Sequence, residues 1–232
     1  MKAMILSAGF GKRLRPLTEK CPKPLLKIND DTLLSNTIKL LIHLGVKQVV
    51  INVHYQAEMM ADYINKKKFN LNITIIKEEE KILDTGGGIF NAIHHFSNEP
   101  FLVINPDTIW NLEYIKEFKI MENEFFINKQ KCSMLVVEKS KSFDKNFKGD
   151  FNLENNLINK KDKNNLHYIY TGLQIIRPEV FSDITSKIFS INEIWNKLIK
   201  SNELHGMKSN IDFLHVSTLD IYKSLLKEKF KC

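Results

Sequence analysis

The sequence is poor in arginine and has no long hydrophobic run, and these two shortages exclude two classes of partner. Only three of its 34 basic residues are arginines: Arg13, Arg15 and Arg177. Arginine is the basic residue that best matches phosphates and base edges, so a basic set made almost wholly of lysine argues against nucleic-acid binding. No apolar stretch approaches the roughly 18 residues that a membrane span needs. We therefore expect neither a nucleic-acid partner nor a membrane partner.

Cysteine is also scarce. Cys21, Cys132 and Cys232 are odd in number, widely spaced and free of any CxxC pattern, so neither a disulfide framework nor a zinc site is predicted. Residues 1–10 are followed at once by basic residues and by no small-residue cleavage site, which argues against a signal peptide. These features predict a protein of the reducing cytoplasm.

The rest of the composition is that of an ordinary globular protein. The 232 residues are 43% hydrophobic, and 34 basic against 27 acidic residues give a net charge of +7. This length fits one α/β domain with at most a small appended element. The positive charge is spread over many lysines and indicates solubility rather than a particular partner.

The first two thirds of the chain alternate short apolar segments with helical patterns, which is typical of β-α-β units around a mostly parallel sheet. Beyond residue 143 the pattern changes to short strands interrupted by polar residues, and then returns to helices. We expect this last third to form a lid or wall over a site. The predicted strands are 3–6, 48–53, 73–77, 101–105, 132–138, 149–153 and 167–176, and the predicted helices are 32–44, 56–66, 88–96, 112–122, 191–201 and 219–229.

The segment that follows the first predicted strand combines glycines with closely spaced positive charges. Glycines at 9 and 11 allow backbone N–H groups to turn toward an anion, and the cations add charge to the same loop. The pattern therefore predicts a polyphosphate-binding loop, although a glycine turn by itself is often only a turn. It is neither a GxGxxG loop nor a Walker A loop. The cations are Lys12, Arg13, Arg15 and Lys23.

A second chemical feature is the end of the predicted strand 101–105. The strand is wholly apolar and ends in Asn105-Pro106-Asp107. In α/β proteins, ligands bind at the carboxyl ends of such central strands, so Asp107 is a candidate site residue. The alternatives are that Asp107 caps the helix predicted at 112–122 or forms an Asx turn.

Several motifs together resemble one known family. Gly-Phe-Gly-Lys-Arg-Leu-Arg-Pro-Leu-Thr at 9–18, followed by Pro-Lys-Pro-Leu at 22–25, is similar to the opening of the sugar-1-phosphate nucleotidyltransferases. The resemblance runs essentially to the end of the chain. Within the family, residues 84–90 and 149–151 most resemble the N-acetylmuramate-1-phosphate uridylyltransferases. The further matching motifs are Thr85-Gly86-Gly87-Gly88, Asn105-x-Asp107, Gly149-Asp150-Phe151 and Thr171-Gly172.

The resemblance implies a GT-A-like, Rossmann-type α/β fold with a mostly parallel central sheet and helices on both faces. It implies one nucleotidyltransferase domain, 1–232, in which 1–140 bind the nucleotide and 141–232 supply the sugar-binding wall and the C-terminal helices. The expected substrates are a nucleoside triphosphate and a sugar 1-phosphate, whose phosphate attacks the α-phosphorus and displaces pyrophosphate. The expected pair is UTP with N-acetylmuramate 1-phosphate. The oligomeric state stays open.

The resemblance also assigns site residues. Arg13 matches the family's catalytic arginine, which binds the β- and γ-phosphates, and Lys23 matches the lysine between the α-phosphate and the sugar phosphate. Asp107 matches the ligand of Mg²⁺, with Mn²⁺ possible. On the sugar side, Lys148, Lys160, Lys161 or Lys163 is expected to meet the phosphate, and spacing does not choose among them. The expected nucleotide contacts are Leu6, Ala8, Gly9, Gly11, Lys12, Glu79, Gly86 and Gly87, and the expected sugar contacts are Asn105, Asp150 and Gly172.

The chain departs from its family near the C-terminus, where His215 stands at the position of a second aspartate ligand. Imidazole is a poor ligand for Mg²⁺ and a better one for softer ions. We favour a metal held by Asp107 and the nucleotide alone over a preference for Mn²⁺ or weakened catalysis. Asp212 is not an equivalent replacement, because strand alternation points it to the face opposite His215.

Three other functions stay open at this stage. A GTP-dependent mannose- or heptose-1-phosphate guanylyltransferase fits the same motifs. A choline-phosphate cytidylyltransferase would need an aromatic cage, for which Trp110, Tyr114 and Tyr168 are candidates. A non-catalytic nucleotide-sugar-binding protein is favoured only by His215.

Overall fold

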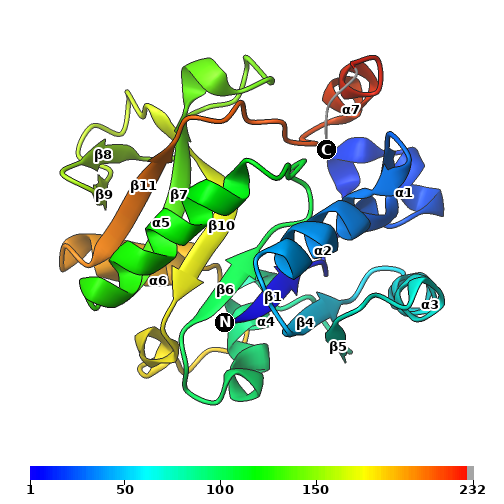
Figure 1. Ribbon diagram of the computed structural model, residues 1–232, viewed down its shortest axis with the longest axis horizontal. Helices are drawn as coiled ribbons and strands as arrows, with labels where there is room; N and C mark the ends of the chain where they lie inside the picture. The colour runs from blue at the N-terminus through cyan, green and yellow to red at the C-terminus, as the bar shows by residue number, and fades with distance from the viewer. Residues whose placement is uncertain (229–232) are drawn as a thin grey trace.

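The computed structural model describes residues 1–228. Across these residues the main sheet has nine strands, in the order β5-β4-β1-β6-β10-β7-β11-β9-β8 (Figure 1). The strands are β1 (Lys2–Leu6), β4 (Gln48–Val53), β5 (Asn72–Lys77), β6 (Phe101–Ile104), β7 (Cys132–Glu138), β8 (Asn152–Glu154), β9 (Leu157–Asn159), β10 (Tyr168–Ile176) and β11 (Leu204–Ser209), with a separate hairpin of β2 (Lys27–Ile28) and β3 (Asp31–Thr32).

The sheet is mostly parallel, as expected. The pairs β5·β4, β4·β1, β1·β6 and β7·β11 are parallel, and β10 runs antiparallel between β6 and β7. The carboxyl ends of β1, β4, β5 and β6 therefore share one edge of the sheet, which is where loops of this architecture bind ligands.

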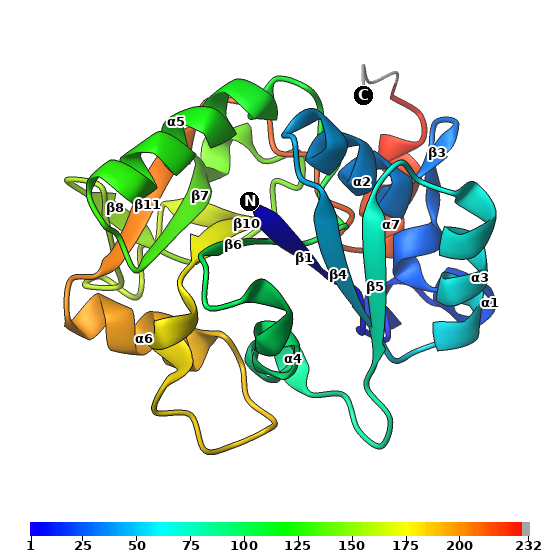
Figure 2. The same ribbon diagram turned by 60° about the horizontal axis from the view of Figure 1, so that its bottom comes forward.

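Helices cover both faces of the sheet (Figure 2). Side chains of α2 (Leu33–His43), α3 (Ala57–Lys67) and α5 (Tyr114–Ile127) share one hydrophobic core, and those of α4 (Asp84–Ala92) and α6 (Asn192–Lys200) share the other. β6 shows why the faces are distinct: Leu102 and Ile104 belong to the first core, whereas Phe101 and Val103 belong to the second. This strict alternation is that of a strand buried on both sides.

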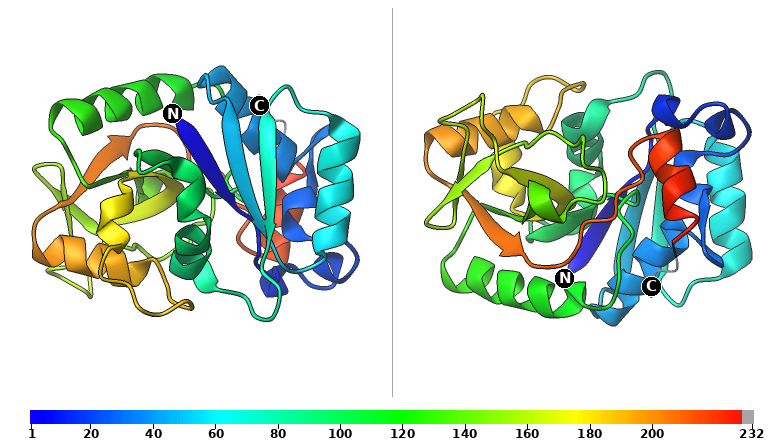
Figure 3. Two further views of the ribbon diagram at one scale, coloured as in Figure 1. Left: turned by 90° about the horizontal axis from the view of Figure 1, so that it is seen from below. Right: turned by 90° about the horizontal axis from the view of Figure 1, so that it is seen from above.

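The remaining helices are short. They are α1 (Leu17–Lys20), α7 (Leu219–Leu225) and five 3-10 turns, η1 (Lys12–Leu14), η2 (Lys23–Leu25), η3 (Ile93–Phe96), η4 (Lys139–Lys141) and η5 (Pro178–Phe181). α7 packs against the opening segment and α2, where Tyr222 and Leu225 meet Leu14 and Leu33 (Figure 3). Tyr222 Oη donates a hydrogen bond of 2.7 Å to the carbonyl of Lys27. In the described part of the chain, no helix has the length and apolarity needed to cross a bilayer.

Local sequence signals account for the best-predicted helix. α2 begins after Thr32, whose hydroxyl accepts a hydrogen bond from the amide of Ser35, as an N-cap does. It ends before Gly45, which has φ of 78°. A positive φ at the residue after a helix is a conformation that glycine adopts at little cost. The predicted span 32–44 is therefore confirmed to within one residue at each end.

Some predicted elements differ from the structure. The helix expected at 112–122 spans Tyr114–Ile127, and the one expected at 88–96 starts earlier, at Asp84, and becomes 3-10 from Ile93. The helix expected at 219–229 ends at Leu225, and position 229 lies outside the described residues. β9, β11 and the β2-β3 hairpin were not predicted. In β11, position 206 requires glycine, since a Cβ there would lie 2.4 Å from Cδ1 of Ile158 on β9. This glycine interrupts the apolar pattern by which the strand could have been predicted.

Candidate active site

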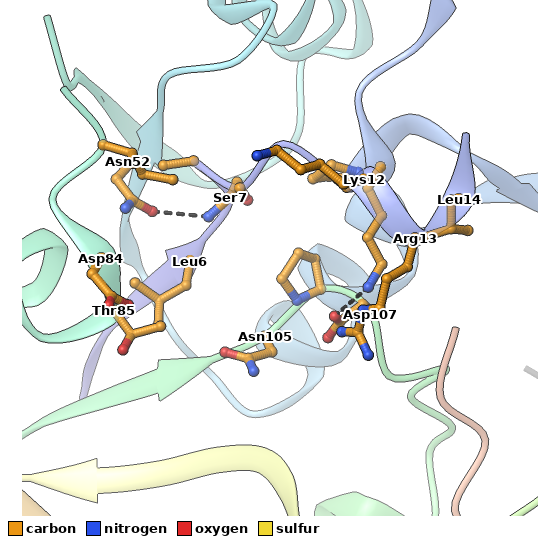
Figure 4. Close-up of a pocket in the computed structure, with 17 residues that line it drawn as sticks. Leu6, Ser7, Lys12, Arg13, Leu14, Asn52, Asp84, Thr85, Asn105 and Asp107 are labelled. Atoms are coloured by element: carbon orange, nitrogen blue, oxygen red, sulfur yellow. Dashed lines mark hydrogen bonds and ion pairs between the residues drawn. The ribbon is translucent and has the colours of Figure 1, made fainter. Parts of the chain in front are cut away.

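A cavity of about 370 Å³ opens at the carboxyl ends of β1, β4 and β6 (Figure 4). Figure 4 shows Asn52, Asp84 and Thr85 on one wall, and Arg13 and Asp107 on the opposite wall. Nine of the residues expected at the site line it: Leu6, Ala8, Gly9, Gly11, Lys12, Arg13, Lys23, Asn105 and Asp107. The other lining residues are Ser7, Leu14, Pro24, Asn52, Ile82, Asp84, Thr85 and Pro106.

The glycine loop is held in place by local contacts. Gly11 has φ of 62°, and a Cβ there would lie 2.9 Å from Cγ2 of Thr18, so both backbone and space require glycine. Thr18 Oγ1 donates a hydrogen bond of 3.0 Å to the carbonyl of Gly11. Leu14 is buried and anchors η1, which leaves Lys12 and Arg13 on the cavity side. Two cations of the loop itself thus face the cavity.

Arg15 does not join them. Its guanidinium lies 3.8 Å from the carboxylate of Glu19, and both side chains are 56% exposed. Residue 15 follows the 3-10 turn with an extended backbone, which directs its side chain away from the cavity. The cluster of four cations expected at the loop is therefore a cluster of three: Lys12, Arg13 and Lys23.

Asp107 lies at the centre of the second wall. Its Oδ2 atom is 2.5 Å from Nζ of Lys23 and 3.2 Å from Nε2 of His215. A short antiparallel pairing brings His215 there, because Ile109 N donates to the carbonyl of Leu214 and Val216 N donates to that of Asp107. The resemblance placed His215 at the position of a second metal ligand, and this pairing between segments more than a hundred residues apart brings it beside Asp107.

The surroundings of Asp107 keep its carboxylate ionised. Burial by itself raises the pKa of Asp107, but the Lys23 ammonium and the His215 imidazole hold it well below its usual range. Oδ1 of Asp107 is buried without a hydrogen-bond partner. The helix N-cap alternative is wrong, since α5 starts only at Tyr114 with Glu113 before it.

The donor set fits a hard divalent cation only in part. Among the described residues, no group of three or more His, Cys, Asp or Glu side chains converges on one point. Asp107 offers a buried carboxylate oxygen without a partner, and His215 offers an imidazole. Mg²⁺ is commonly held by one or two carboxylates together with substrate phosphates. The protein thus supplies few ligands, and a metal here would take most of its ligands from the substrate. Asp212 contributes none, because its side chain is 79% exposed and pairs with Lys141.

Two polar residues that sequence analysis missed brace the other wall. Asn52 Oδ1 accepts a hydrogen bond of 2.8 Å from Ser7 N, and Asn52 Nδ2 donates one of 2.7 Å to Glu78 Oε1. Glu78 Oε2 in turn accepts from Leu83 N at 2.8 Å. This chain of buried hydrogen bonds joins the ends of β1, β4 and β5 to the start of α4. A lone asparagine within an apolar strand was the signal that could have revealed it.

Glu79, the acidic residue expected at the site, faces away from it. Its carboxylate is 74% exposed and lies 3.9 Å from Nζ of Lys77. Strand alternation explains the difference, because Glu78 continues β5 toward the interior and the following residue turns outward. The acid that contacts the cavity wall is therefore Glu78.

Gly86 and Gly87 do not line the cavity. A Cβ on Gly86 would lie 2.4 Å from the ring of Phe189, and one on Gly87 would lie 2.3 Å from the carbonyl of Lys187. The amide of Gly87 already donates to the carbonyl of Phe189. The glycines of α4 are therefore needed for close packing against residues 187–191.

Gly172 and Asp150 lie beyond the cavity, on the side of β10. Gly172 has φ of 94°, and its carbonyl accepts a hydrogen bond of 2.8 Å from Asn105 N. A Cβ there would lie 2.9 Å from Cβ of Asn105. Asp150 Oδ2 accepts from Tyr170 N at 3.0 Å, and burial raises the pKa of Asp150. Gly172 thus sets the position of Asn105, and Asp150 extends the polar region away from the glycine loop.

Among the four candidate lysines, Lys160 is the one near Asp150. Burial lowers the pKa of Lys160, and Asp150 partly offsets this effect. Its Nζ lies 4.8 Å from the centre of the Phe151 ring. Lys161 instead pairs with Glu154 at the surface, at 2.6 Å. Lys160 is thus the lysine held beside the expected sugar contacts.

Two of the three rings considered for an aromatic cage lie in the core and not at the cavity. Trp110 and Tyr114 are each 1% exposed, and their rings pack edge to face at 4.8 Å inside the core. Trp110 Nε1 donates to the carbonyl of Asn105. These two rings support the strand end and are too buried to take part in a cage around a quaternary ammonium group.

Comparison with known proteins agrees with this geometry. The family model described as "Nucleotidyl transferase" matches residues 2–147, which is more than half of the chain. The chain belongs to the nucleotidyl transferase family. It is therefore an enzyme of nucleotidyl transfer, as the opening motif indicated. The matched segment includes the glycine loop, the Asn52–Glu78 bridge and Asp107.

Individual relatives agree on the family and differ in substrate. An N-acetylmuramate alpha-1-phosphate uridylyltransferase of Caulobacter vibrioides is 27% identical over 92% of this chain and 90% of its own length. A mannose-1-phosphate guanylyltransferase catalytic subunit beta of Drosophila melanogaster is 30% identical over 89% of the chain, which spans only 56% of that protein. The crystal structure of HddC from Yersinia pseudotuberculosis complexed with GMP-PN has a TM-score of 0.77 at 22% identity, over 97% of this chain and 98% of that one. These neighbours confirm the GT-A-like nucleotidyltransferase fold.

Proposed function

We propose that this nucleotidyl transferase joins a nucleoside triphosphate to a sugar 1-phosphate, forming an NDP-sugar and pyrophosphate, with UTP and N-acetylmuramate 1-phosphate as the substrates. The observation that carries the proposal is the cavity that Lys12, Arg13, Lys23 and Asp107 line, in which Lys23 pairs with Asp107. The substrate pair rests on likeness to the uridylyltransferase, which extends over nearly the full length of both chains. In this proposal, residues 1–140 bind the nucleotide and 141–232 form the sugar side of one cytoplasmic domain.

The positions of the cations suggest how the reaction is assisted. Phosphoryl transfer of this kind needs reactants held in line and neutralisation of charge on the phosphate oxygens, and no protein nucleophile. Arg13 lines the cavity beside the glycine loop, where its planar fork can hold two phosphate oxygens of the leaving pyrophosphate. Lys23 is fixed by Asp107 and flanked by prolines, so its ammonium is placed before substrate arrives.

The base and ribose are assigned to the wall opposite Arg13. That wall is formed by Leu6, Ser7 and Ala8 together with Ile82 and Thr85. The Asn52–Glu78 bridge fixes its width, because it ties Ser7 N to Leu83 N through two side chains. Because this wall is already rigid, binding a planar base against it loses little conformational entropy of the protein.

A divalent cation is part of the proposal. Asp107 would hold it through the oxygen that lacks a partner, with phosphate oxygens as further ligands and His215 beside it. The cation would supply Lewis-acid stabilisation of charge on the phosphates. We favour Mg²⁺, and the imidazole makes Mn²⁺ the alternative.

The sugar phosphate is assigned to the region between Lys23 and Lys160. Lys160 is held beside Asp150, and Asp150 is buried enough to orient a sugar hydroxyl by accepting a hydrogen bond. Gly172 keeps Asn105 at the boundary between the two substrates. The attacking oxygen would thus approach the α-phosphorus from the β10 side.

A pyrophosphate-release assay tests the proposal. Purified protein is incubated with each of UTP, GTP, CTP, ATP and dTTP against a panel of sugar 1-phosphates, with Mg²⁺ or Mn²⁺. We expect the highest kcat/KM for UTP with N-acetylmuramate 1-phosphate. GTP with mannose 1-phosphate is the second candidate, favoured by the 30% identity to a guanylyltransferase subunit. If nucleotide binds but no pair releases pyrophosphate with either metal, the protein is a non-catalytic binding module and the proposal fails.

A further inference from the structure

The outer surface of α5 carries an unusual concentration of exposed apolar side chains. Of the eight large hydrophobic residues that are exposed within residues 1–228, four lie on α5 or in the turn that enters it. They are Leu112 at 51%, Ile120 at 46%, Phe126 at 47% and Ile127 at 68% exposure. A shallow groove runs along the same surface, lined in part by Leu112, Ile115 and Ile120. Clustered exposed apolar residues of this kind indicate an interaction surface.

This surface is separate from the active site. The inner side of α5 is fixed to the sheet by Tyr114, Phe118, Met121 and Phe125, which are all buried. No residue of α5 lines the cavity at β1, β4 and β6. Figure 2 shows α5 on the outside of its helix layer, with no other helix covering it. A partner bound there would leave the cavity open.

We propose that the partner is a second copy of this chain, and that two α5 helices pack antiparallel about a two-fold axis beside Ile120. In a symmetric dimer the same patch must complement itself. Residues four apart form a ridge along a helix, and when such ridges of two antiparallel copies cross at Ile120, the residue four positions before Ile120 lies beside the residue four positions after it in the second copy. The charges on this ridge can therefore be checked against the geometry.

The charges meet this requirement. Lys116 precedes Ile120 by four residues and Glu124 follows it by four, so each lysine faces a glutamate of the second copy. In the part of the chain that the structure describes, neither of these two side chains enters a salt bridge. Both charges are thus free to pair between copies.

Apolar residues lie on and beside this ridge. Leu112, Ile115 and Ile120 line the same groove, and Ile127, which follows Ile120 by seven residues, lies about two turns further along the same side of α5. The parallel arrangement would instead bring Lys116 against Lys116 and Glu124 against Glu124. The charge pattern therefore selects the antiparallel pair.

The contact is expected to be modest in size. A helix of 14 residues is about 21 Å long, so two crossed copies bury an area near the lower end of specific interfaces. We therefore expect a reversible dimer whose population rises with protein concentration. Sedimentation velocity should show a mass that moves from 27.1 kDa toward twice that value as concentration increases.

Charge reversal tests the register. Lys116→Glu alone and Glu124→Lys alone each place like charges opposite one another twice, and each should raise the dimer dissociation constant about tenfold. A 1:1 mixture of the two variants should restore wild-type association, because every contact in the mixed dimer is again opposite in charge. The rescue should weaken at high salt. No effect within one chain produces rescue on mixing.

Apolar substitution provides the second arm. Ile120→Asp should abolish association, whereas Met59→Asp on α3, where the side chain is 42% exposed, is the matched control and should associate as wild type. Both variants should keep the wild-type pyrophosphate-release rate, so loss of the dimer is distinguishable from loss of function. A wild-type chain that stays monomeric at all concentrations, or single charge variants that do not rescue each other, would overturn the proposal.

Discussion

Asn52 Nδ2 donates a hydrogen bond of 2.7 Å to Glu78 Oε1, and both side chains are at most 3% exposed. This contact connects β4 to the residue that follows its neighbour β5 and fixes the wall of the cavity opposite Arg13. Gly88 packs against it so closely that a Cβ would lie 2.7 Å from Asn52 Nδ2. Gly88 therefore leaves the space that the Asn52–Glu78 hydrogen bond occupies.

Removing the Glu78 carboxylate should destabilise the protein and weaken nucleotide binding. Glu78→Ala leaves Asn52 Nδ2 and Leu83 N buried without acceptors, at a cost of about 1–3 kcal/mol each. We expect Glu78→Gln to lose less, since its amide oxygen still accepts one of the two bonds. Denaturant unfolding and nucleotide titration measure the two effects. Glu79→Ala, at the exposed neighbour, is the control and should stay within about 0.5 kcal/mol of wild type.

Arg13 and Arg15 form a matched pair for the phosphate-binding claim. They are two residues apart, but only Arg13 lines the cavity. Arg13→Ala should lower kcat/KM by about 10²–10³-fold, the effect of losing one preorganised donor to developing charge. Arg13→Lys should recover only part of this, because an ammonium lacks the planar fork. Steady-state pyrophosphate release is the measurement, and Arg15→Ala should remain near wild type. Equal losses for the two alanine variants would contradict the assignment.

Lys160 and Lys161 form a matched pair of neighbours that tests which lysine binds the sugar phosphate. We expect Lys160→Met to raise the KM for the sugar 1-phosphate about tenfold, which corresponds to about 1.4 kcal/mol, with little change in the KM for the nucleotide. Lys161→Met removes only a surface ion pair with Glu154 and should change neither constant. If the nucleotide KM shifts instead, Lys160 belongs to the nucleotide side.

Asp150 predicts a pH-dependent difference in stability. Burial raises the pKa of Asp150, so the folded protein binds this proton more tightly than the unfolded chain does. Stability is then lost as the pH rises from about 3.9, the unfolded value, through the raised folded pKa. Asp150→Asn removes this loss and keeps an oxygen that can accept from Tyr170 N. Calorimetry should show a higher Tm for the variant at pH 7 and a smaller gap at pH 4.5. If the wild-type protein were more stable than Asp150→Asn at pH 7, burial of the Asp150 carboxylate would not be the cause.

The sequence predicted the fold where burial leaves a plain periodic pattern. The strand of Phe101–Ile104 and the helix of Leu33–His43 have uninterrupted apolar signals and recognisable ends. β11 was missed because Gly206 and its polar neighbours conceal a strand whose partners are distant in sequence. α5 continues past the expected end at 122 to Ile127, and the boundary was obscured because Phe125, Phe126 and Ile127 are all apolar although only Phe125 is buried.

The site residues, too, were predicted where the signal is local in sequence and missed where it is not. The glycine loop and Asp107 were predicted because their residues lie next to one another in sequence or at the end of a clear strand. Asn52 and Glu78 were missed because their role comes from a contact between strands. His215 was expected near Asp107 only through the family resemblance, and the short pairing of residues 107–109 with 214–216 is what brings the two together.

The central claim is that the cavity at β1, β4 and β6 binds a nucleoside triphosphate along the glycine loop. A crystal structure with a non-hydrolysable UTP analogue and a divalent cation tests it most directly. We predict phosphate oxygens within hydrogen-bond distance of Arg13 and of the backbone amides at 9–13, with the base between residues 6–8 and 82–85. A loop that contains no nucleotide, with Lys12 and Arg13 directed into solvent, would contradict the claim.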